Sequence, residues 1–168
     1  MSRLAIMLTG ALLGALLLTA TASAGVSKHC RLISRTDIGS PVGMSHLRLS
    51  GTTVANPSLT GAKGRLALCD FSDATVGTVA STSIATLGSP TAARKEFSAQ
   101  IHKARRTMKT RKLAEPFWND GYYLGKDGIL VLKGRYIFHL QYASGLKRFS
   151  QVTVPVLTIL SAKAVNKL

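Results

Sequence analysis

The chain has 168 residues, of which 22 are Lys or Arg and 7 are Asp or Glu, giving a formal net charge of +15. This length allows one domain with a hydrophobic core, and no apolar run beyond the N-terminal segment is long enough to cross a bilayer. So large a positive charge attracts polyanions such as nucleic acid, anionic lipid headgroups and acidic polysaccharides, but charge alone does not choose among them.

Residues 1–24 have the three-part pattern of a cleavable secretory signal peptide. Arg3 gives a charged start, an apolar run extends over 4–18, and Ala22-Ser23-Ala24 matches the A-x-A pattern that precedes cleavage. The alternative is a retained membrane anchor, but the apolar run is short for a span of about 20 residues. We therefore expect cleavage before Gly25 and a mature form, residues 25–168, that is periplasmic or secreted and does not span the membrane.

The two cysteines, Cys30 and Cys69, are expected to form a disulfide, because an exported domain folds in an oxidising compartment. Closing the loop between them would stabilise the fold by roughly 4 kcal/mol in the chain-entropy model. The alternative is a reactive thiol. It is less favoured because Cys69 lies in a strand-like run beside Asp70, which would raise the pKa of the thiol.

Strands are expected in two groups along the chain. The first is a hairpin of residues 65–71 and 75–87 around a turn at 72–74. The second is a meander of three strands joined by tight turns at Lys126-Asp127-Gly128 and Lys133-Gly134, with the strands at 121–125, 129–133 and 135–142. The segment 42–64 is loop-like, with one candidate strand at 46–50.

The clearest helix is predicted to begin at Ser89-Pro90, since Ser89 can cap the helix and Pro90 suits the first helical position. It is expected to run to about Thr110, because one apolar stripe recurs at helical spacing at Ala93, Phe97, Ile101, Ala104 and Met108. Phe97 and Ile101 are expected to anchor this stripe in the core.

A second helix is predicted at the C-terminus, beginning near Pro155, where Leu157, Leu160, Ala164 and Leu168 form a stripe. One helical turn is also possible at 34–38. Strands joined by short turns, with helices lying on the sheet, define an α+β fold. We expect a single domain with an antiparallel sheet of about five strands, hairpin plus meander, packed by two main helices.

The order of these features resembles that of small extracytoplasmic α+β domains in bacterial lipoproteins and sensor-kinase ectodomains, which have a PsbP-like fold. The shared features are an early cysteine and short helix, a second cysteine in a strand, a helix opened by Ser89-Pro90, the segment Trp118-Asn119-Asp120-Gly121-Tyr122 before a meander, and a final Leu/Ala helix. The resemblance covers most of 30–168 and implies this architecture and a non-enzymatic protein. The chain lacks the lipid-attachment cysteine of the lipoproteins, and no site residue is carried over.

Basic residues are concentrated in and after the first long helix, with Glu96 as the one acid among Arg94, Lys95, Lys103, Arg105, Arg106, Lys109, Arg111 and Lys112. On a helical wheel most of the basic residues lie away from Phe97. A solvated outer face usually carries both signs of charge, whereas this one is almost entirely positive. The pattern predicts a polyanion-binding face formed by Lys95, Arg105, Arg106 and Lys109. The alternative is a diffuse basic field.

Four aromatic residues near the meander, Phe117, Trp118, Tyr122 and Tyr123, could stack on a sugar or a base. Packing in the core and on the sheet is the more ordinary interpretation. The sequence contains no H-x-x-x-H or H-E-x-x-H spacing, no G-x-S-x-G and no phosphate-binding glycine loop, so we predict no catalytic residues, no metal and no cofactor.

The leading hypothesis is therefore an exported, non-enzymatic binding or accessory protein that presents a basic helix face to an envelope or extracellular polyanion. One alternative is a small exported hydrolase with a site assembled in the fold from carboxylates or His139. Another is an inhibitor or escort that places the same basic face on an acidic exported protein.

Overall fold

The computed structural model describes residues 27–114, 116–146 and 148–168. Within them the chain forms one α+β domain, as predicted, around an antiparallel sheet of seven strands. The predicted signal peptide and its cleavage site lie outside the described residues. The helices of the described part are too short or too polar to cross a membrane.

The strands follow the order β1-β2-β3-β7-β6-β5-β4 across the sheet. The predicted hairpin is β2 with β3, and the predicted meander is β5, β6 and β7. Antiparallel pairing of β3 with β7 joins these two units into one continuous sheet. The strands are β1 (Arg48–Ala55), β2 (Gly64–Asp73), β3 (Gly77–Leu87), β4 (Arg111–Lys112), β5 (Asp120–Tyr123), β6 (Ile129–Lys133) and β7 (Tyr136–Tyr142).

Two strands extend the sheet beyond the five that were expected. β1 begins later and runs further than the candidate strand at 46–50, because its backbone follows β2 as far as the pair Ala55–Arg65. β4 has only two residues, which is too short for any alternation of side chains to mark it in the sequence.

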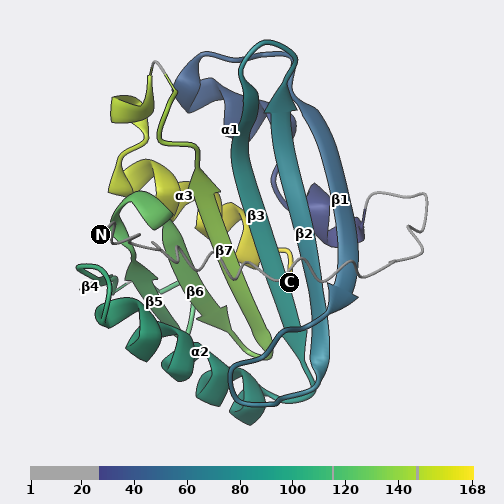
Figure 1. Cartoon of the computed structure of the whole chain (residues 1–168), viewed down its shortest axis with the longest axis vertical. Coiled ribbons are helices and arrows are strands. Elements are labelled where there is room, and N and C mark those ends of the chain that lie inside the picture. Colours follow the sequence, from purple (N-terminus) through teal and green to yellow (C-terminus); the bar gives the residue numbers. More distant parts are fainter. Residues whose placement is uncertain (1–26, 115, 147) are drawn as a thin grey trace, which may run out of the picture.

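Helices cover both faces of the sheet (Figure 1). The helix α2 (Pro90–Arg105) lies in front of the sheet, and α3 (Val154–Val165) lies behind it together with the short α1 (Arg35–Gly39). The described residues also form 3-10 turns at η1 (Lys28–Arg31), η2 (Ser40–Val42), η3 (Gly125–Asp127) and η4 (Phe149–Gln151).

The core has two layers because successive strand residues point to opposite faces. On β7, Phe138 packs into the layer behind the sheet with Leu157 of α3, whereas its neighbour Ile137 packs in front with Phe97 of α2. Phe97 and Ile101 are 3% and 4% exposed, as the apolar stripe predicts. The same stripe ends in Ala104 and Met108, which are partly buried against the front layer.

The predicted disulfide is confirmed, with the Cα atoms of Cys30 and Cys69 5.4 Å apart. It attaches η1 to the middle of β2 within the rear core layer. A second tie to the N-terminal segment is the buried Tyr142, whose hydroxyl donates to the Ile38 carbonyl at 2.7 Å. Burial raises the pKa of this phenol, and nearby Asp37 adds to the effect.

Candidate binding face on helix α2

The start of α2 is the one that the sequence predicts, but its end is not. The Ser89 hydroxyl oxygen accepts a hydrogen bond from the Ala92 backbone N–H at 3.1 Å, and Pro90 follows the cap. The helix ends at Arg105 rather than near Thr110. Its last turn tightens as the N–H of Thr107 and the Thr107 hydroxyl both bond to the Ala104 carbonyl.

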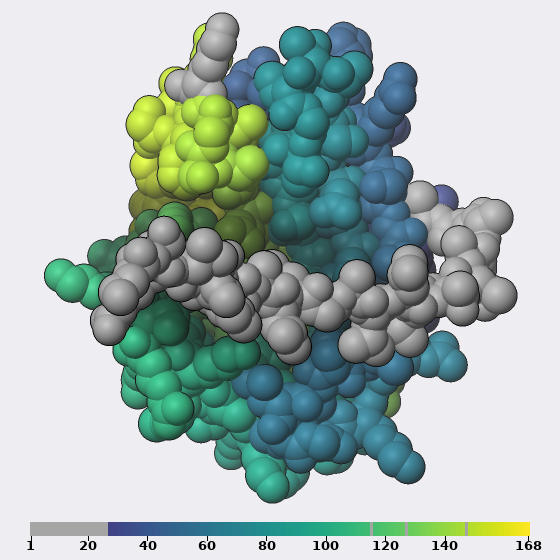
Figure 2. Space-filling view, viewed as in Figure 1, coloured from purple at the N-terminus to yellow at the C-terminus, as the bar shows by residue number. Residues whose placement is uncertain are grey.

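This earlier end divides the predicted polyanion-binding residues. Lys95 and Arg105 are exposed on α2, and Arg106 is its exposed C-cap. Lys109 is exposed on the segment that connects α2 to β4, and is therefore not part of the helix face. Arg94 and His102 join the face, which we define as the outer face of α2: Arg94, Lys95, His102, Arg105 and Arg106. The helix α2 itself lies at the surface, at the lower left of Figure 2.

The one acid of α2 contributes nothing to this outer face. Glu96 is completely buried on the opposite side of the helix, where its carboxylate accepts hydrogen bonds from the loop that precedes β2. Desolvation opposes ionisation there, but hydrogen bonds from Ser58, Gln100, Leu59 and Thr60 outweigh it and lower the pKa of Glu96 to about 2. The exposed charges of α2 are consequently all positive.

A groove of about 500 Å³ runs along one edge of the outer face, between α2 and β5. Three basic or potentially basic side chains line it from the helix: Arg94, His102 and Arg105. Asn119 and Asp120 line it from the sheet. The Asp120 carboxylate lies 3.5 Å from Lys112 Nζ, so its charge is offset by a neighbouring cation. Lys95 and Arg106 do not line the groove, and both are exposed.

Arg105 is held in place by an aromatic side chain of β5. Its guanidinium lies over the Tyr122 ring, 5.2 Å from the ring centroid, and its Nη2 donates to the Tyr122 hydroxyl at 3.2 Å. The Tyr122 ring in turn packs beside Phe97, with the ring centroids 6.1 Å apart. Arg105 is thus the one predicted binding residue that is fixed against the core. Lys95 and Lys109 are exposed on the surface. Arg106 is exposed too, but its Nη2 lies 3.1 Å from His102 Nε2.

The four aromatic residues considered for stacking do not form one platform. Tyr122 is buried in the front core layer, whereas Trp118 is buried in the rear layer and Tyr123 packs against it. Only Phe117 is exposed, at 38%. Successive side chains of β5 point to opposite faces of the sheet, which separates Tyr122 from Tyr123. Trp118 and Tyr122 are core residues, so for these two the packing interpretation is correct.

Three of the groups considered for a hydrolase, namely His139, Asp37 and Glu96, lie on different elements of the described part of the chain. His139 lies half-buried on β7, opposite Ser83 of β3. Asp37 Oδ1 lies 2.6 Å from Lys163 Nζ, and the Glu96 carboxylate accepts hydrogen bonds from the loop before β2. Across the described ranges, no three of His, Cys, Asp and Glu come together where they could hold a metal ion. The hydrolase therefore stays a prediction.

The fold and this face define a basic α+β domain in which one surface helix exposes only positive charges. Comparison with models of protein families, with curated proteins and with solved structures finds no match to the chain. The resemblance to PsbP-like domains therefore stays a prediction, and the function has to be argued from the residues themselves.

Proposed function

We propose that this protein is an exported, non-enzymatic binding domain that holds an anionic polymer of the envelope or extracellular space against the outer face of α2. The observation that carries the proposal is the burial of Glu96. A surface helix ordinarily shows both signs of charge to solvent, and here the one acid is withdrawn into the structure while the basic residues remain outside.

The shape of the face favours a linear polymer over a small anion. The basic side chains line a groove edge and continue onto the convex outside of the helix, so they do not converge on one point. Repeated contacts with successive anionic groups release condensed counterions, which gives affinity without a closed pocket. Arg105, held on Tyr122, supplies one preorganised contact on this face.

The proposal is tested by the salt dependence of binding, with a short fluorescent duplex DNA as the probe polymer. Four phosphate contacts predict a slope of log K against log salt concentration of about −3.6. Replacing Lys95 and Arg106 together with Gln is expected to reduce the size of that slope by about 2, because two contacts are lost. Both side chains lie outside the core, so the unfolding free energy should stay within about 0.5 kcal/mol of the parent.

The matched control is the double variant Lys28→Gln and Arg31→Gln on η1, which removes the same charge from exposed positions elsewhere. It should change the slope much less. An equal change in both double variants would show a diffuse basic field, and the site would be wrong. Arg105 is left intact in this test because its removal would also disturb the packing of Tyr122.

A further inference from the structure

A second surface, behind the sheet, is as unusual as the outer face of α2. The helix α3 packs Leu157, Leu160 and Val165 into the rear core, as an amphipathic helix should. Its exposed side, however, is also largely apolar, and Ile159 is 57% exposed there. Lys163 is the only charged residue of the helix. An apolar surface on the outside of a domain with this many charges indicates a contact with something else.

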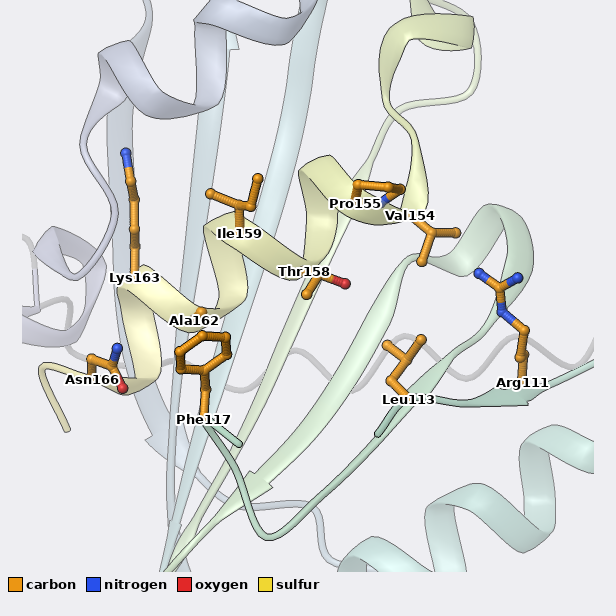
Figure 3. Close-up of a pocket in the computed structure, with 10 residues that line it drawn as sticks. All are labelled: Arg111, Leu113, Phe117, Val154, Pro155, Thr158, Ile159, Ala162, Lys163 and Asn166. Carbon is orange, nitrogen blue, oxygen red and sulfur yellow. The ribbon is translucent and has the colours of Figure 1, made fainter. Parts of the chain in front are cut away.

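This apolar side of α3 forms one wall of a groove of about 620 Å³ (Figure 3). The helix contributes a row from Val154 through Ile159 and Ala162 to Asn166, which runs about 18 Å at 1.5 Å per residue. The opposite wall comes from the connection between β4 and β5, where Leu113 and Phe117 lie across from the helix. The volume falls within the range of roughly 300–1,000 Å³ that is common for small-molecule sites.

One end of this groove carries a cation that is held in position. The pairing of β4 with β5 places Arg111 opposite Tyr123, on the face of the sheet that α3 covers. The Arg111 guanidinium lies over the Tyr123 ring, 5.7 Å from its centroid, and stands beside Val154 in Figure 3. At the other end of the groove, Lys163 is already paired with Asp37. Among the described residues, the ion pairs of the domain do not include Arg111.

From this arrangement we infer that the α3 groove binds a medium-chain fatty acid, with its carboxylate at Arg111 and its alkyl chain along Ile159 and Ala162. A guanidinium can donate two parallel hydrogen bonds to a carboxylate. The apolar row gives an alkyl chain a surface to bury, at about 25 cal/mol per Å² removed from water. A hollow on the other flank of Ile159 contains Asp37 and Lys163, whose charges offset each other, so it offers the head group no unpaired cation.

The inference is independent of the proposed function, since the groove and the outer face of α2 lie on opposite sides of the sheet. It is tested by isothermal titration of the purified protein with dodecanoate below its micelle concentration. Dodecanol, which has the same chain without the charge, and acetate, which has the charge without the chain, separate the two halves of the site. Dodecanoate should bind most tightly, dodecanol more weakly, and acetate not measurably.

Two variants address the two halves of the groove. Arg111→Gln should weaken dodecanoate binding about tenfold or more, as expected for a lost charge-assisted hydrogen bond, and leave dodecanol binding unchanged. Ile159→Asp should weaken both ligands about tenfold or more, because it places a carboxylate beside the chain. Both positions are exposed, so the variants should fold, and their circular dichroism should match that of the parent.

The matched controls reproduce each change at another place on the surface. Arg135 also lies over a tyrosine ring, that of Tyr136 at 5.5 Å, and Val76 is an exposed apolar side chain at 51%. Arg135→Gln and Val76→Asp should leave dodecanoate affinity within about twofold. Equal weakening by test and control variants, or no binding below the micelle concentration, would overturn the inference. So would a dimer that Ile159→Asp dissociates, because the groove would then be an interface between two copies.

Discussion

Glu96 of α2 and Thr60 of the loop before β2 are 36 residues apart in the chain, and one carboxylate oxygen joins them twice. Oε2 accepts a hydrogen bond from the Thr60 backbone N–H at 3.0 Å and another from the Thr60 hydroxyl at 2.9 Å. The same carboxylate accepts from the Ser58 hydroxyl, the Leu59 N–H and the Gln100 amide. Glu96 therefore closes the loop onto the helix and withdraws the one negative charge of α2 from its exposed face.

Replacing Glu96 with Gln is expected to lower the free energy of unfolding by about 2–4 kcal/mol. The amide keeps one acceptor oxygen but turns an NH₂ group toward donors such as the Ser58 hydroxyl and the Thr60 N–H, which then lose their partner. Urea unfolding of parent and variant measures the difference. Asp70→Asn, an exposed acid-to-amide change on β2, is the control and should cost less than about 0.5 kcal/mol. Similar losses in both variants would show that the loop does not depend on this carboxylate.

The same carboxylate predicts how stability depends on pH. The pKa of Glu96 is about 2 in the folded protein, against an ordinary value of 4.5. Because the folded pKa is the lower one, the stabilisation is fully present above pH 4.5 and is lost as the pH falls toward 2. Between those values, the unfolding free energy should fall by at most about 1.4 kcal/mol per pH unit on account of this group.

Asp37 adds to this acid dependence, since its hydrogen bond to Lys163 holds the pKa of that carboxyl below its usual range. The two contributions separate when the titration is repeated with Glu96→Gln. The variant should show a shallower decline between pH 4.5 and 2, with the remaining slope due to Asp37 and other acids. A variant and parent that lose stability in parallel would contradict the assignment to Glu96.

Substitutions in the buried apolar stripe of α2 and at its exposed basic residues are expected to change the free energy of unfolding by very different amounts. Phe97→Ala should lower the unfolding free energy by about 3–5 kcal/mol, because it empties a site that is 3% exposed. Lys95→Ala, two residues earlier and exposed, should change it by less than about 0.5 kcal/mol. Thermal or urea unfolding of the two single variants makes the comparison. Equal, small effects would mean that the helix does not pack on the sheet as described.

Much of this fold could be predicted from the sequence where periodic patterns were long. The Ser89 cap, the stripe through Phe97, the Cys30–Cys69 disulfide and the strands of the meander all depend on local spacing or on simple pairing. β4 could not be predicted in this way, since only its pairing with β5 makes Arg111 and Lys112 a strand. The end of α2 at Arg105 was missed because the apolar stripe continues to Met108, although the backbone has already left the helix.

The candidate site was less accessible to sequence reasoning than the fold. The basic run was evident, but the burial of Glu96 depends on hydrogen bonds to a loop far away in the chain. The signal was the lone acid among cations, whose direction on the helical wheel differs from that of Arg94, Arg105 and Arg106, although Lys103 lies close to it. The groove along α3 was missed because it forms between segments some forty residues apart. A helix with almost no polar face was the available clue.

Gly51 of β1 gives the last prediction, because the disulfide lies directly against it. A Cβ atom added at Gly51 would stand 2.5 Å from Cys30 Sγ and 2.9 Å from the Leu68 carbonyl oxygen, which is closer than such atoms can approach. Gly51→Ala should therefore lower the unfolding free energy of the disulfide-bonded protein by about 1–3 kcal/mol. In a background where Cys30 and Cys69 are both Ala, the sulfur is absent and only the contact with the Leu68 carbonyl remains. The cost of Gly51→Ala should then be less than half as large.

The double-mutant cycle separates this effect from that of the disulfide, whose removal should itself cost about 2–5 kcal/mol. Gly88→Ala is the control, since a Cβ at Gly88 would meet nothing within 4 Å, and it should be neutral or slightly stabilising in both backgrounds. Urea unfolding of each variant, with and without the cysteines, supplies the coupling energy. If Gly51→Ala costs the same in both backgrounds, the clash of the added Cβ atom is with the backbone of β2 alone. The disulfide would then stabilise the domain without fixing how closely β1 approaches η1.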